Sequence, residues 1–353
     1  MRVTTSRPLP DRLRTATAST ADVGAVARAV FVTVARDVPF AFACLATTDP
    51  ASGLITGAFK SSALPLGDEE FAAAEYGQAD VNLFSEIAAR PVPVGVLSVD
   101  TGGRPEQCRR LHGYMTPQFG FVDEIRLACR TGGTTWAAMA LYRTAGEPFF
   151  TAEEGRTLAP AHEVVADAVR RALFADGPDV LAGPAAGPGS GPRVPVVLLV
   201  DDADRMTGRT AAAEDLVEDL GGWDHGALPA PVLAVAATAR ARDALASARV
   251  RGRSGDWLTV QGLPLEGTGG RRSVVLTVER AAASVVGTMA IAARGLTLRE
   301  QDVVGLVLQG ASTKAIAAAL HLSPHTVQDH LKAVFVKLGV TSRRDLVAQL
   351  AVS

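Results

Sequence analysis

Apolar positions in the first half of the chain recur with two different spacings. Between residues 21 and 38 they return every three to four positions, at Val23, Val26, Val30 and Val34, which predicts a helix. Strand-like runs are predicted at 40–47, 54–59, 120–129 and 134–143, and further helices at 69–89 and 151–174. This order is typical of an α+β domain, which we place at residues 20–175, behind a flexible tail at 1–19.

A second α+β domain is predicted further along the chain. Residues 176–193 are rich in glycine, proline and alanine, a composition typical of a linker. Beyond this linker, strand-like segments and a short helix are predicted at 194–200, 211–220, 249–253, 257–263 and 273–279. We therefore expect a second domain at 194–280 and a connecting helix at 281–294.

Four short helices are predicted after residue 295. Each begins at a residue whose side-chain oxygen caps helices well, namely Thr297, Ser312, Ser323 and Ser342. Thr297 is followed three positions later by Glu300, which is the pattern of a capping box.

The third of these helices has two different sides. Its apolar residues lie at helical spacing, at Val327, Leu331, Val334 and Leu338, while His325, Gln328, Asp329 and Lys332 lie on the opposite side. Only His321 and Leu322 separate it from the preceding helix. Two short helices with a tight connection, the second polar on its exposed side, predict a helix-turn-helix.

The C-terminal segment resembles the DNA-binding domain of the LuxR/NarL family of transcriptional regulators. The matching residues are Leu296-Thr297-x-Arg299-Glu300, Gly310-x-Ser312-x-Lys314-x-Ile316-Ala317, Leu322-Ser323-x-x-Thr326-Val327-x-x-His330 and Lys337-Leu338-Gly339-Val340-x-Ser342-Arg343. The resemblance implies that the third helix reads bases with Gln328, Asp329 and Lys332. It implies that phosphates are contacted by Lys314, Ser323, His325, Thr326, Lys337 and Arg343, and that a dimer interface includes Leu346, Val347 and Leu350.

Asp329 is an acidic residue where the DNA potential is strongly negative. Its carboxylate either accepts a hydrogen bond from cytosine N4 or stays back and tunes specificity by repulsion. The sequence leaves both readings open.

The two preceding domains resemble known sensory modules. Residues 20–175 resemble a GAF domain, with Pro148-Phe149 and Thr151-Ala152-Glu153-Glu154 before the last helix. Residues 194–280 resemble a PAS domain, with the closing pattern Val250-Arg251-x-Arg253-x-Gly255-x-Trp257-Leu258. Both resemblances imply either an unidentified small-molecule ligand or protein contacts without a ligand. We thus expect a multidomain chain of two α+β sensor-type domains followed by an all-α four-helix domain.

Charge supports a local contact with DNA. The 353-residue chain carries a net charge of −2, whereas six basic and four acidic residues after position 295 leave that segment at +2. So few basic contacts predict weak binding by a monomer, and hence a homodimer on inverted-repeat half-sites in the major groove of double-stranded DNA.

Several functional classes are not expected. The three cysteines form no CxxC pair, the histidines are scattered, and phosphate-loop and hydrolase motifs are missing, so we expect no metal, no cofactor and no enzyme. No apolar run reaches the ~20 residues of a membrane span, which predicts a cytoplasmic protein with no membrane contact. The predicted function is a sequence-specific DNA-binding transcriptional regulator controlled by its sensory domains. The alternative is a constitutive DNA-binding protein whose front domains form a scaffold.

Overall fold

The computed structural model describes residues 7–65, 67–175, 196–266, 272–282, 285–287, 289 and 293–350. The chain divides into two compact units. The first consists of Met1–Arg130, Thr135–Leu173 and Arg193–Arg280, and the second of Thr131–Thr134, Phe174–Pro192 and Ala281–Ser353. The predicted linker at 176–193 lies outside the described residues, as does much of the predicted connecting helix at 281–294.

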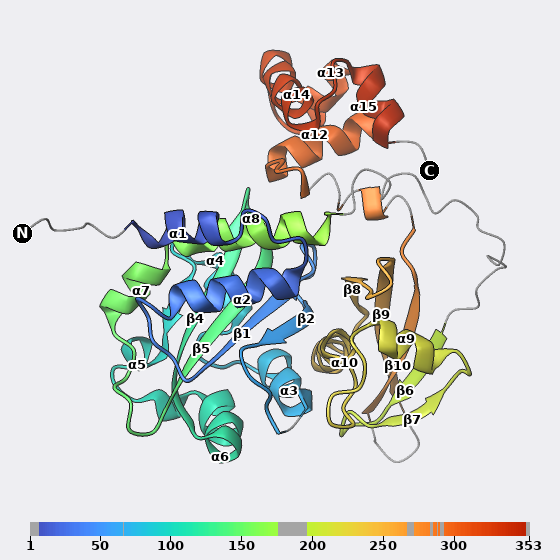
Figure 1. The fold of residues 1–353 in the computed structure, drawn as a ribbon. Coiled ribbons are helices and arrows are strands. Elements are labelled where there is room, and N and C mark those ends of the chain that lie inside the picture. The colour runs from blue at the N-terminus through green and yellow to red at the C-terminus, as the bar shows by residue number, and fades with distance from the viewer. Residues whose placement is uncertain are drawn as a thin grey trace, which may run out of the picture. The chain divides into compact units, whose positions relative to one another are not determined.

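A five-stranded sheet forms the centre of the first domain (Figure 1). Its strands are β1 (Phe42–Thr48), β2 (Ile55–Lys60), β3 (Val94–Val96), β4 (Phe121–Thr131) and β5 (Thr134–Thr144). They lie in the order β2-β1-β5-β4-β3, and β1 pairs antiparallel with β2 and with β5. The four longer strands were all predicted, because each is a largely apolar stretch between turn residues.

The prediction of a flexible tail at 1–19 is wrong for residues 7–19, the part of it that the structure describes. Residues Leu9–Ala16 form helix α1, which packs with α2 (Val23–Val34) and α8 (Ala161–Leu173). Leu9 and Leu13 are buried at this contact. One pair of leucines four residues apart is enough to fix a two-turn helix against a preformed apolar surface.

Each of the two long helices predicted in this domain is two helices. Residues 69–89 form α3 (Glu69–Gly77) and α4 (Phe84–Ala89), and Asn82 between them has a left-handed φ of 58°. The second is divided into α7 (Ala152–Leu158) and α8, and the predicted capping box of Thr151 with Glu154 is confirmed. Four further short elements were not predicted: α5 (Leu97–Asp100), η1 (Pro105–Gln107), η2 (Leu111–Met115) and α6 (Thr116–Phe119).

The second domain repeats the same sheet order. Its strands β6 (Val196–Val200), β7 (Met206–Arg209), β8 (Ala246–Arg251), β9 (Trp257–Glu266) and β10 (Arg272–Arg280) lie in the order β7-β6-β10-β9-β8. Numbered within each domain, both sheets therefore read second, first, fifth, fourth, third. Two helices accompany this sheet, the predicted α9 (Ala213–Asp219) and α10 (Ala230–Arg242).

Helix α10 was not predicted, and it joins the two domains into one unit. All its residues from Pro231 to Ala239 are buried, because one side packs on the second sheet and another on α3 and β2 of the first domain. Leu54 and Ala72 of the first domain belong to the same apolar core as the second sheet. The two predicted α+β domains therefore share one apolar core and form a single compact unit.

The second unit contains the predicted four helices. They are α12 (Leu298–Leu308), α13 (Thr313–Ala319), α14 (Pro324–Leu338) and α15 (Arg343–Leu350). At the start of each helix, one side-chain oxygen accepts the expected backbone hydrogen bond at 3.0–3.3 Å. The four accepting residues are Thr297, Ser312, Ser323 and Ser342. Within the described residues, the whole structure has no helix long and apolar enough to cross a membrane.

Candidate functional site

The turn between α13 and α14 fixes the position of the second helix. His321 adopts a left-handed φ of 54°, and the Leu322 amide donates to the Ala317 carbonyl at 2.8 Å. The Arg299 guanidinium of α12 donates to the Leu320 carbonyl at 3.0 Å. A third helix thus holds the turn, so α14 is presented at a fixed angle.

Helix α14 has the two sides that its sequence predicted. Val327, Leu331, Val334 and Leu338 are buried in a core that they share with α12, α13 and α15. His325, Gln328, Asp329 and Lys332 are exposed. The polar side is therefore free to enter a groove while the apolar side holds the helix on its scaffold.

Two predicted phosphate contacts form the start of α14. Ser323 Oγ accepts from the Thr326 amide at 3.0 Å and lies 2.8 Å from Thr326 Oγ1. Ser323 is exposed and Thr326 is half-buried. Both hydroxyls lie at the positive end of a 15-residue helix, where an anion is favoured.

The exposed charges of α14 are paired with one another. Asp329 Oδ1 lies 3.5 Å from the Lys332 ammonium, and Asp329 Oδ2 lies 3.9 Å from Nδ1 of His325. The predicted base-contacting lysine is therefore partly neutralised on its own helix. In high dielectric such an exposed pair is weak, so Lys332 can exchange this partner for a guanine.

Two other predicted phosphate contacts already have protein partners. The Lys337 ammonium lies 2.6 Å from Oε2 of Glu300, and the Arg343 guanidinium donates to the Ala311 carbonyl. Lys337 thus connects α14 to α12, and Arg343 connects α15 to the turn between α12 and α13. Lys314, by contrast, is exposed, and no ion pair is recorded for it among the described residues.

Glu300 is buried, and its ionised carboxylate is stabilised by hydrogen bonds. Burial acts against the ionised carboxylate, but hydrogen bonds from Lys337 and from Thr297 lower the pKa of Glu300 below its ordinary value. The carboxylate also closes the capping box of α12, because it accepts from the Thr297 amide at 2.7 Å. Sequence alone predicted the capping box but not the lysine partner.

The predicted dimer residues differ in their accessibility. Leu346 is completely buried in the core of the helical unit, so it is unavailable to a partner subunit. Val347 is half-buried at the edge of that core, and the side chain of Leu350 lies outside the described part of the chain. The dimer interface stays a prediction, and Leu346 is removed from it.

Val336 is an exposed apolar residue of α14 that sequence reasoning missed. It is 83% exposed and lies four positions after Lys332, and thus eight after Gln328, on the same side of the helix. The signal was available, since Val336 falls outside the apolar stripe of its own helix. A valine presented to the major groove can contact a thymine methyl group.

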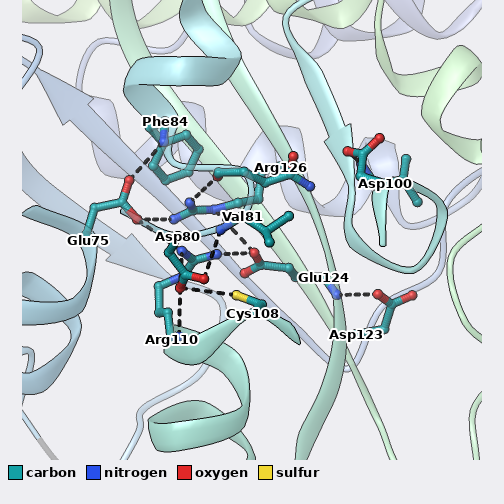
Figure 2. Close-up of polar contacts among 12 residues, drawn as sticks. Glu75, Asp80, Val81, Phe84, Asp100, Cys108, Arg110, Asp123, Glu124 and Arg126 are labelled. Atoms are coloured by element: carbon teal, nitrogen blue, oxygen red, sulfur yellow. Dashed lines mark hydrogen bonds and ion pairs between the residues drawn. The ribbon is translucent and has the colours of Figure 1, made fainter. Parts of the chain in front are cut away.

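The first domain contains a buried ionic cluster that no sequence motif indicated. Figure 2 shows Arg110 and Arg126 between the carboxylates of Glu75, Asp80 and Glu124, and each of these side chains is at most 2% exposed. Arg126 lies 2.8 Å from Glu75, Arg110 lies 3.6 Å from both Glu75 and Asp80, and Arg110 also pairs closely with Glu124. Buried charges paired in this way hold neighbouring elements in one arrangement.

Comparison with known proteins identifies the helical domain. Residues 294–350 match the model of the luxR family of bacterial regulatory proteins. A segment of 56 residues is 54% identical to an HTH-type transcriptional regulator of Mycobacterium bovis, covering 16% of this chain and 6% of that protein. A segment of 54 residues is 44% identical to the monoamine regulon transcriptional regulator of Klebsiella aerogenes, covering 15% and 24%. The chain thus spans only a small part of these relatives.

A solved structure was also compared with the chain. The complex of Vibrio cholerae VqmA with ligand and DNA is 18% identical, with a TM-score of 0.23, over 44% of this chain and 80% of that one. A TM-score this low does not establish a shared fold, so the comparisons identify only the domain at residues 294–350. Residues 294–350 are thus a helix-turn-helix domain of the luxR family of bacterial regulatory proteins.

Proposed function

We propose that this protein is a sequence-specific transcriptional regulator that inserts α14 into the major groove of DNA. The observation that carries the proposal is the division of α14 into a buried apolar stripe and an exposed polar side, within a LuxR-family domain. The polar side of such a helix does not contribute to the core of its own domain. In this motif, the N-terminal half of the helix contacts base edges.

Base reading is assigned to Gln328, Asp329 and Lys332. Glutamine pairs with adenine, and lysine with the O6 and N7 acceptors of guanine. Asp329 lies 3.5 Å from Lys332, which favours a role as a local brake on nonspecific attraction to DNA.

Phosphate contacts are assigned to Lys314, Ser323, His325 and Thr326. Lys314, Ser323 and His325 are exposed, and Ser323 and Thr326 lie at the helix start that favours anions. Lys337 and Arg343 act first as braces between helices, so their contribution to DNA binding is secondary. Few phosphate contacts per domain favour binding as a homodimer on inverted half-sites.

The first unit is assigned a sensory role. Its two sheets share one strand order, which supports two related modules of GAF-like and PAS-like type. Because α10 packs on both, a change in either module is transmitted to the other by direct contact.

Selection of genomic DNA fragments tests the proposed function. The full chain and the fragment 295–353 are each incubated with sheared DNA at two salt concentrations, and bound fragments are sequenced. A shared inverted-repeat motif supports sequence-specific binding, and different affinities of the two proteins support control by the first unit. Equal affinities support the alternative, in which the first unit is a scaffold. No enriched sequence with either protein contradicts the proposal.

A further inference from the structure

A cavity in the first unit is walled by both of its domains. One side is the face of β1, β2 and β5 together with α3, and another is α10 of the second domain, through Ala230 and Ala234. About 690 Å³ of space lies between its walls, counting the part open to solvent, and the centre of a water-sized sphere can occupy about 50 Å³. The cavity therefore holds more than a single water, and its open side leaves space for a small molecule.

The lining of this cavity is apolar and aromatic. Phenylalanines contribute ring surfaces from several elements, and the alanines of the sheet leave space because their side chains are short: Phe42, Phe71, Phe84, Ala46, Ala138 and Ala140. The Arg126 guanidinium lies over the Phe84 ring, 3.7 Å from the ring centroid. Phe84 therefore separates the cavity from the buried ionic cluster. A rigid wall of this kind favours a preformed pocket for a flat molecule.

The charges at the cavity are already balanced. Lys60 and Asp68 both line it, and the Lys60 ammonium lies 3.0 Å from Asp68 Oδ1 and 3.1 Å from Asp224 Oδ2 of the second domain. A charged ligand would have to displace one of these partners or remain unpaired in an apolar site, which is costly. The lining therefore selects an uncharged molecule.

Tyrosine hydroxyls are the polar groups that the lining offers such a molecule. The Tyr76 hydroxyl accepts from the Ile55 amide at 2.9 Å, and the Tyr114 hydroxyl donates to the Gly67 carbonyl at 3.1 Å. Tyr142 also lines the cavity and is 2% exposed, and no hydrogen bond of its hydroxyl is recorded within the described residues. Buried hydroxyls are normally bonded, so this one is open to a ligand atom.

We propose that this cavity binds a small, uncharged aromatic molecule, and that α10 makes its binding depend on contact between the two domains. Part of the wall belongs to α10, and the Lys60–Asp224 pair ties the segment just before α10 to β2 at the same place. A bound molecule therefore stabilises the docked arrangement over an undocked one. This inference does not require DNA binding, so the two proposals fail separately.

Binding of neutral probes to the full-length protein tests the inference. Indole, phenol and toluene are titrated up to their solubility limits, and the melting temperature and saturation-transfer NMR signals are measured. We expect saturable binding of at least one probe and a rise of the melting temperature with its concentration. Benzoate and benzylamine serve as charged controls, and we expect neither to saturate. No saturable neutral probe, or tight binding of a charged one, would overturn the assigned ligand class.

Space-filling variants test the shared wall. Ala230→Leu fills the cavity from the second domain and Ala58→Leu from the first, while Ala73→Leu on the exposed side of α3 is the matched control. Both filling variants should weaken probe binding on the order of tenfold or more, and Ala73→Leu should leave it unchanged. Native far-ultraviolet circular dichroism establishes that each variant is folded. Loss of binding in Ala58→Leu with normal binding in folded Ala230→Leu would show a pocket of the first domain alone.

Discussion

The Lys337 ammonium lies 2.6 Å from the Glu300 carboxylate and ties the last turn of α14 to the first turn of α12. The same carboxylate closes the capping box with Thr297. One acidic side chain thus both caps α12 and positions α14. Glu300 and Lys337 both belong to the LuxR-like pattern of the sequence, and their ion pair gives each of them a structural role.

Replacing Glu300 by glutamine should destabilise the helical domain by about 1–3 kcal/mol at neutral pH, because a cap and an ion pair are weakened together. The folded-state pKa of Glu300 is lowered, so its contribution is complete above the unfolded value of 4.5 and is lost as the pH falls through the folded value. Denaturant unfolding of the fragment 295–353 at neutral pH and below about pH 4 measures this difference. An equal loss of stability by wild type and Glu300→Gln on acidification would contradict the assignment.

Lys337→Ala should act mainly on folding rather than on DNA. We expect a lower melting temperature of the helical domain and, under conditions where the domain is folded, at most a small uniform loss of affinity for all DNA sequences. Arg344→Ala removes one exposed charge of α15 and serves as the control for charge alone. A large affinity loss with an unchanged melting temperature would return Lys337 to the phosphate contacts.

Asp329→Asn should strengthen DNA binding. The change removes a carboxylate that lies 3.5 Å from the Lys332 ammonium, and an exposed pair at such a distance is worth about 1 kcal/mol in water. We therefore expect roughly fivefold tighter binding to unrelated sequences, measured by fluorescence anisotropy at fixed salt. Weaker binding confined to the selected site would instead assign Asp329 to cytosine.

Arg110→Met should strongly destabilise the first unit. Arg110 faces three carboxylates in a cluster closed to solvent (Figure 2), and loss of one partner leaves buried charge uncompensated. Such losses typically cost about 3–5 kcal/mol. Arg156→Ala, which breaks an exposed pair with Glu153, should change unfolding by no more than about 0.5 kcal/mol. Similar melting temperatures for the two variants would show that the cluster contributes little.

The three cysteines should react slowly in the native protein. Burial raises the pKa of Cys44 and of Cys108 to about 12, and burial also raises the pKa of Cys129. At neutral pH all three are protonated thiols, whereas the thiolate is the reactive form. An aromatic disulfide reagent should modify all three rapidly only after unfolding. Fast modification of one thiol in the folded protein would indicate a redox-sensitive site.

The helical domain was the most predictable part of the chain, because its signals are local. Four capping residues and one apolar stripe each act within a few positions, and all of them hold in the structure. What sequence missed there is long-range, such as the partner of Lys337 and the burial of Leu346. These depend on how α12 and α15 pack on α14.

The first unit was less predictable for the same reason. Helix α10 is apolar on every side, so its sequence has no clear helical period, yet that pattern is what a helix between two domains requires. The ionic cluster joins Glu75, Arg110 and Arg126, which lie far apart in the chain and carry no motif. The cavity likewise combines wall residues from segments far apart in the chain, including Ala230 and Ala234 of α10.

The central claim is that α14 reads DNA sequence, and a comparison of affinities tests it most directly. Wild type, Gln328→Ala and Lys332→Ala are titrated with the selected duplex and with a shuffled duplex of equal length, with Arg171→Ala as a charge-matched control outside the helical domain. We predict that each α14 variant loses about 1–3 kcal/mol on the selected duplex and little on the shuffled one. Equal binding of both duplexes by wild type, or unchanged discrimination in both α14 variants, would contradict the claim.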